Sequence, residues 1–139
     1  MTPNRIIPDL QCLLLCEDIR QEASGNLILV GVINVIRVPQ VPITAARLLV
    51  MNRWCAGVGQ FTETLRVIAP DGTVIRKNSS KFQLGDPTQV AVLANVFGNL
   101  EFPAGGVYHV EVLVDEVMKL RYPVPVVVVP QPQGGAPTA

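Results

Sequence analysis

The side chains that could carry chemistry are few and far apart in this sequence. His109 is the only histidine among 139 residues. A single histidine cannot form a zinc-binding cluster of histidines, and it would be the one residue that could serve as the base of a catalytic triad. It alternates with apolar residues beside Glu111, so we expect a solvent-facing strand residue. This shortage of acid, base and nucleophile pairs predicts that the chain is not an enzyme and uses no cofactor.

The three cysteines do not have the spacing of a metal or disulfide site. Cys12 and Cys16 lie on one predicted strand, roughly 13 Å apart, beyond the ~7 Å that a disulfide spans. Cys55 could meet either of them across the sheets. The chain begins without a recognisable secretory signal, which favours reduced thiols used as small apolar core residues and indicates the cytoplasm.

Acidic residues in predicted turns give one alternative site. Asp71, Asp86 and Asp115 each lie in a separate turn. Sandwich domains bind calcium with aspartates that gather on the loops at one end. Each residue is more simply explained as a turn former. A small-ligand or Ca²⁺ site on these loops is therefore the alternative hypothesis.

The elements that position these residues are predicted to be strands. Short apolar stretches alternate with turn signals along the chain, and helical periodicity is almost absent. The sequence predicts an all-β, two-sheet antiparallel β-sandwich of immunoglobulin-like type, with about eight strands and little helix. Residues 1–129 form this single domain, and residues 130–139 form a flexible tail rich in proline, glycine and glutamine.

Three segments carry more specific expectations. Residues 17–25 are polar and predict a connection, whereas residues 26–33 are apolar on both faces and predict a strand buried on both sides. Residues 76–81 hold Arg76, Lys77 and Lys81 and predict a solvated turn, with binding of an anionic partner as the alternative.

The closing hairpin has the clearest alternation. Apolar residues share one face of each strand; they are Tyr108, Val110, Val112 and Val114, then Met118, Leu120 and Tyr122. Because paired residues share a face, we expect Val114 opposite Met118, with either a three-residue loop at 115–117 or a bulge. Glu111 then lies across from Arg121 as an exposed ion pair.

Two other residues have expected places. Glu63 shares a face with Phe61 and Leu65, which favours a position near a sheet edge, with a partnership to Arg53 as the alternative. Trp54 ends a strand and is expected to anchor the core between the sheets.

The composition predicts a surface that another protein covers. Hydrophobic residues make up 49% of the chain and charged residues 16%, but no apolar stretch is long enough to span a membrane. Eleven basic and eleven acidic residues balance, which argues against nucleic acid. The final strand holds Val124, Val126, Val127, Val128 and Val129 between prolines, which is typical of an edge. We therefore expect a non-enzymatic binding or assembly module that forms a homo-oligomer or joins a larger complex, such as a particle, through an apolar sheet face or this strand.

Two resemblances bear on the fold. Gly106-Val-Tyr108-His-Val110 after Phe102-Pro103 resembles the start of the penultimate strand in immunoglobulin-like sandwiches, which implies a tyrosine hydroxyl that secures a corner. Val110 stands where antibody domains have a disulfide cysteine, so no such bridge is implied. Nearly the whole chain, including Cys16-Glu-Asp-Ile-Arg-Gln-Glu22, resembles a family of small bacterial proteins of unknown function. That resemblance implies no activity.

Overall fold

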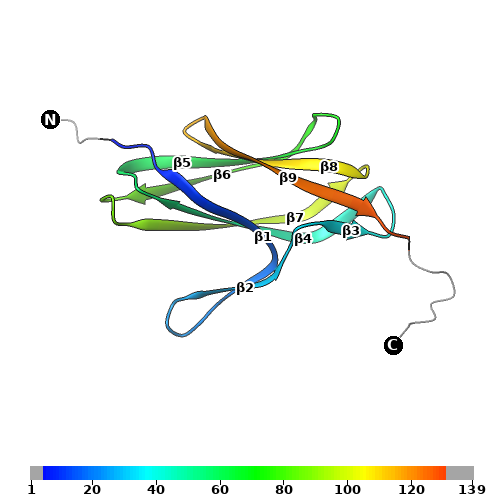
Figure 1. The fold of residues 1–139 in the computed structure, drawn as a ribbon, viewed down its shortest axis with the longest axis horizontal. Helices are drawn as coiled ribbons and strands as arrows, with labels where there is room; N and C mark the ends of the chain where they lie inside the picture. Colours follow the sequence, from blue (N-terminus) through cyan, green and yellow to red (C-terminus); the bar gives the residue numbers. More distant parts are fainter. Residues whose placement is uncertain (1–4, 131–139) are drawn as a thin grey trace.

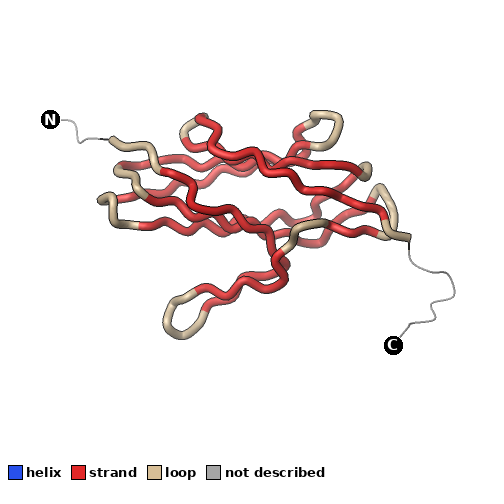
Figure 2. Tube along the Cα trace, in the orientation of Figure 1, coloured by secondary structure: helices blue, strands red, loops and turns tan. Residues whose placement is uncertain are grey.

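The computed structural model describes residues 5–130, and within them the chain forms nine strands and no helix. Figure 2 shows strands joined by short turns through almost the whole described chain. The strands are β1 (Asp9–Gln21), β2 (Leu27–Val32), β3 (Ile36–Val38), β4 (Ile43–Cys55), β5 (Gly59–Ile68), β6 (Val74–Leu84), β7 (Val90–Phe102), β8 (Gly106–Val114) and β9 (Val117–Val128).

The strands form two layers, which confirms the predicted two-sheet sandwich (Figure 1). One sheet has the order β2-β1-β4-β7, and the other has the order β3-β9-β8-β5-β6. Every pair is antiparallel except β3 and β9, which run parallel. The predicted tail lies outside the described residues, apart from Pro130.

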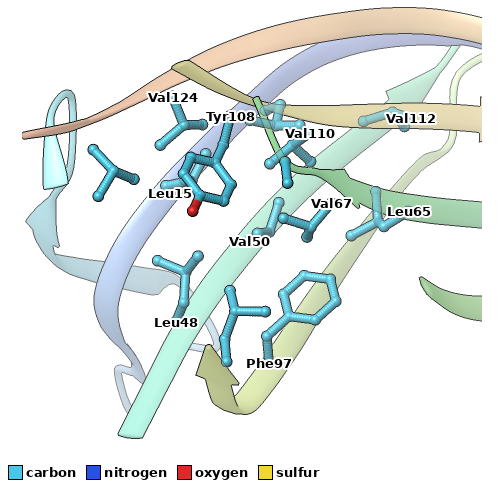
Figure 3. Packing of buried hydrophobic residues seen from close by; sticks show 14 of the residues in the cluster. Leu15, Leu48, Val50, Leu65, Val67, Phe97, Tyr108, Val110, Val112 and Val124 are labelled. Carbon is cyan, nitrogen blue, oxygen red and sulfur yellow. The ribbon is translucent and has the colours of Figure 1, made fainter. Parts of the chain in front are cut away.

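The core fills the space between the inner faces of the two sheets (Figure 3). Side chains alternate along each strand, so Leu48, Val50 and Trp54 of β4 point inward toward β8. Trp54 has no exposed surface, which confirms its predicted role as a core anchor. Full burial of a single such apolar side chain stabilises the fold by about 1.5–3 kcal/mol.

The tyrosine corner implied by the immunoglobulin-like resemblance is present. The Tyr108 hydroxyl donates to the carbonyl of Ala104 at 2.6 Å and accepts from the amide of the same residue at 3.2 Å. The ring packs edge-on against Phe102 with centroids 5.2 Å apart. These contacts fix the turn that carries the chain from β7 in one sheet to β8 in the other.

The closing hairpin confirms part of its predicted register. Glu111 lies opposite Arg121 and a bulge follows Val112, both as expected. Val114 pairs with Val117 instead of Met118, so the turn contains two residues, and the three-residue loop was wrong. Glu111 is also almost buried, because the guanidinium groups of Arg66 at 2.9 Å and Arg121 at 3.8 Å lie against its carboxylate.

Two segments predicted as connections are strands. Residues 76–81 belong to the continuous strand β6, so the basic turn was wrong. Strand β1 continues to Gln21 and forms a hairpin with β2 in place of the predicted polar connection. No residue of β2 is buried, which contradicts the predicted two-sided burial. We call residues 18–32 the arm, because this hairpin projects from the sandwich (Figure 1).

Candidate protein-docking surface

The three loop aspartates each hold their own turn. Asp71 accepts a hydrogen bond from the amide of Thr73 at 2.9 Å, and Asp86 accepts one from the amide of Thr88 at 2.7 Å. These bonds lower the pKa of Asp71, chiefly through the Thr73 amide, and that of Asp86, chiefly through the Thr88 hydroxyl. Asp115 accepts from the amide of Thr62 and pairs with Arg5.

The structure does not bring these three residues together. Asp71 follows the end of β5, where Ile68 pairs with His109 near the start of β8. Asp115 follows the other end of β8, and Asp86 follows Leu84, which pairs with Gly59 at the start of β5. Asp71 is therefore at the opposite end of the sheet from the other two. Residues 5–130 contain no group of three or more potential metal ligands.

His109 keeps its expected place on an outward face. It alternates with the core residues Tyr108 and Val110, is half-buried, and lies between Ile68 of β5 and Pro123 of β9. Its outward neighbours on those two strands are apolar, so the registered pairs give it no acidic partner for acid–base chemistry.

All three cysteines are unpaired, as expected, and all lie on the outer face of the β2-β1-β4-β7 sheet. Cys16 pairs with Leu49, Cys12 with Arg53, and Cys55 with Val90. Cys16 has no exposed surface, and burial raises the pKa of its thiol. None of the three belongs to the core cluster between the sheets, so the prediction that they are core residues was wrong.

A buried carboxylate joins the two sheets, and the sequence did not predict it. Glu63 of β5 is 1% exposed, so the predicted edge position was wrong. Its Oε2 accepts from Nδ2 of Asn52 at 3.0 Å and from Nε1 of Trp54 at 2.6 Å, both on β4. Its Oε1 accepts from Nδ2 of Asn95 on β7 at 2.9 Å. Arg53, the alternative partner, points to the outer face.

This cluster is built to hold the sheets in register. All three N–H donors already point at the carboxylate, and the four residues are almost inaccessible to solvent. Asn52 Oδ1 is buried without a hydrogen-bond partner in the described part of the chain. Asn52 and Asn95 occupy inward positions of their strands, as Glu63 does. These inward polar residues were the one signal in the sequence that could have predicted a buried polar cluster.

The outer face of the β2-β1-β4-β7 sheet is mostly apolar. Register places the outward side chains in rows across the strands. One row contains Val32, Cys16, Leu49 and Val96, the next contains Leu14, Met51 and Ala94, and the third contains Cys12, Arg53 and Val92. We call the outward side chains of β1, β4 and β7 in these rows, together with Val90, the docking face.

Exposure on the docking face is concentrated on β7. Val90, Val92 and Val96 are 43%, 44% and 52% exposed. Leu49 and Met51 of the neighbouring strand are almost covered. The exposed valines therefore form a strip along the outermost strand of the sheet.

The opposite outer face has a different character. The corresponding row across the β3-β9-β8-β5-β6 sheet contains Lys77, Arg66, Glu111 and Arg121. Ion pairs at Glu111 link three of these residues. Water solvates this charged row well, whereas contiguous exposed apolar side chains are typical of interaction sites.

The arm stands over part of the docking face. Leu27 and Leu29 of β2 lie across a hollow of about 350 Å³ from Met51 and Val92. Arg53 lines the same hollow and is its one charged residue. In Figure 1 the arm lies below the layer that contains β4 and β7. The hollow is open, apolar on two sides, and continuous with the exposed valines of β7.

The C-terminal valines are not an edge strand, which corrects the predicted position. Val126 pairs with Gly106 of β8 on one side and with Ile36 of β3 on the other. Val124 and Val126 are core residues, whereas Val127, Val128 and Val129 are exposed. The amide of Val129 also donates to the carbonyl of Val38. Because β3 occupies the free side, another strand cannot add there.

Comparison with known proteins gives a family but no activity. The model described as "Family of unknown function (DUF6941)" matches residues 11–127. No curated protein matches the chain. Residues 5–130 include no helix of the length and apolarity needed to cross a membrane.

Proposed function

We propose that this chain, which belongs to the family of unknown function DUF6941, is a non-enzymatic docking and assembly module that binds a protein through its docking face. The observation that supports this proposal is the asymmetry between the two outer faces. One carries a row of four charged residues, and the other carries rows of apolar residues with exposed valines on β7. Burial of apolar surface contributes about 25 cal/mol per Å².

The docking face replaces the C-terminal strand as the proposed contact. Strand addition at residues 124–129 requires a free edge, and β3 already pairs with that part of β9. The apolar face requires no rearrangement, because its valines are exposed in the folded chain. Unpaired cysteines on this face support a reducing compartment, the bacterial cytoplasm.

A matched pair of substitutions tests the proposal. Val92 on the docking face and Val107 on the opposite sheet are 44% and 46% exposed. Val92→Lys places a charge in the apolar surface, whereas Val107→Lys makes the same change outside it. Tagged wild type and both variants are used to recover bound proteins, including untagged copies of the chain, from the native host.

We expect a protein recovered by wild type and by Val107→Lys to be depleted at least about tenfold by Val92→Lys, because a partner would have to bury the new ammonium group. Circular dichroism of each variant checks the fold. Equal recovery by all three proteins would show that the docking face is not the contact surface.

A further inference from the structure

We infer that the partner is a second copy of this chain, which pairs antiparallel with residues 90–97 at the β7 edge of the docking face about a two-fold axis, so that the exposed valines of β7 meet across the contact. This inference rests on the proposed function and adds the identity of the partner and the geometry of the contact. It joins two four-stranded sheets into one continuous sheet, as in strand addition between domains.

The four edge strands differ in how well they are protected against pairing. Edges that proteins keep free of partners are short or carry charged residues, above all lysine. Strand β3 has only three residues, and β6 carries Arg76, Lys77 and Lys81. Residues 90–97 of β7 have the sequence VAVLANVF, with neither charge nor proline. Within the described residues, β4 is the only strand that pairs with β7.

Part of the β7 edge is already occupied, which limits the contact. Nη2 of Arg76 donates to the carbonyls of Gly98 and Asn99 at 3.0 and 3.1 Å. Asn99 also has a positive φ of 52°, which interrupts an extended edge. The open part is therefore residues 90–97, about 27 Å of extended chain at 3.4 Å per residue.

The absence of charge indicates a second copy as the occupant. A two-fold interface pairs residue i of one copy with residue j of the other and j with i, so a strand whose charges are all positive meets like charges. Strand β6 would bring lysines together, whereas the exposed side chains of residues 90–97 are all apolar and Asn95 points inward to Glu63. The formal net charge of the whole chain is zero, so two copies do not repel each other.

The side chains at this edge also fit self-pairing. When the two-fold axis passes through one residue of β7, each outward side chain of one strand lies opposite an outward side chain of the other. It therefore continues the rows of the docking face from one copy to the next. On the inner side, Ala91 and Leu93 pack against the core but remain half-exposed. A second β7 strand would cover both of them and close the sandwich at this edge.

The other apolar edge, β2, is less suited to the contact. Gly31 has a positive φ of 66°, which breaks the extended backbone in a six-residue strand. Pairing of β2 with β7 of another copy would join two different edges of one sheet. Such a contact would continue from copy to copy without closing.

The test uses the purified full chain and two lysine variants. Ala94 and Ser79 are both exposed residues of long edge strands, β7 and β6. Ala94→Lys would place like charges close together across the two-fold axis, whereas Ser79→Lys makes a similar change on the protected edge. Molar mass is measured by sedimentation over a wide range of concentrations, with circular dichroism as a check of folding.

We expect wild type and Ser79→Lys to reach twice the 15.0 kDa of one chain. Ala94→Lys should raise the dissociation constant at least about tenfold. As a second readout, mild oxidation should link Ala94→Cys into a covalent dimer but leave Ser79→Cys unlinked beyond the background of the native cysteines.

Three results would overturn the inference: a wild-type monomer at every concentration, a dimer that Ala94→Lys leaves unchanged, or a mass that grows without limit. If wild type is a monomer but still recovers another protein that Val92→Lys loses, the second copy is wrong as the partner and the proposed function stands. If wild type is a monomer and Val92→Lys loses no recovered protein, both the second copy and the proposed function are contradicted.

Discussion

At the scale of single residues, the buried Glu63 carboxylate is the most demanding feature of the fold. A carboxylate in an apolar core is tolerated only with hydrogen-bond partners, and Asn52, Trp54 and Asn95 supply three N–H groups. Because these donors come from the opposite sheet, the cluster specifies how the two layers face each other. An apolar residue at position 63 would leave all three donors unpaired.

We predict that Glu63→Gln destabilises the fold by about 1–3 kcal/mol, because one acceptor oxygen becomes an NH₂ group that faces an N–H donor. Glu63→Leu should destabilise it more, although leucine is apolar, because every donor then loses its acceptor. Urea unfolding gives both free energies. A Glu63→Leu variant as stable as wild type would show that the cluster contributes nothing to stability.

How well a residue could be predicted depends on where its partners lie. Tyr108 binds Ala104, four positions away, and its corner was expected from a local pattern. Glu63 meets residues from two strands of the other sheet, and alternation within β5 carries no information about them. The pattern revealed the inward direction of Glu63 but not its partners, so the sheet-edge interpretation was wrong.

At the scale of elements, the β8–β9 turn is closed by residues that do not favour its backbone. Asp115 and Glu116 have positive φ values of 47° and 69°. Both central residues of a type I′ hairpin have positive φ, and such turns prefer Asn-Gly or Asp-Gly. The three-residue loop was expected because the alternation of apolar residues put Val114 opposite Met118, and the bulge after Val112 shifts that register by one residue.

Glu116→Gly should therefore raise the free energy of unfolding by about 1 kcal/mol, because glycine adopts positive φ without the steric cost of a Cβ atom. Glu116→Ala provides the control, since it removes the carboxylate and keeps the Cβ atom. Thermal and urea unfolding compare the two variants. If alanine stabilises the chain as much as glycine, loss of the charge and not relief of the backbone is responsible.

Most strands were predictable from alternation, but their neighbours were not. The Glu111–Arg121 register followed from the period of two within one hairpin. The position of β9 depended on β3, a three-residue strand that reaches it in parallel from a distant part of the sequence. No local pattern marks such a pairing, so the C-terminal valines were wrongly placed at an edge.

At the scale of the whole molecule, the outer face of one sheet carries a row of ion-paired charges, whereas the outer face of the other carries rows in which Arg53 is the one charged residue. The apolar surplus of the sequence predicted a covered surface; exposed valines lie on β7 and at the C-terminal end of β9, but of these two strands only β7 has an open edge in the described chain, because β3 pairs with β9. The exposed arm and the open β7 edge belong to the same sheet as this face. The proposed docking at the β7 edge would cover the exposed valines and the open strand together.

Hydrogen–deuterium exchange of the full chain at low and high concentration tests this account most directly. We predict that backbone amides of residues 90–97 exchange more slowly at high concentration, because a second β7 strand then binds them, while amides of β6 exchange at the same rate at both concentrations. Unchanged exchange along β7, or protection that appears on β6 instead, would contradict the account.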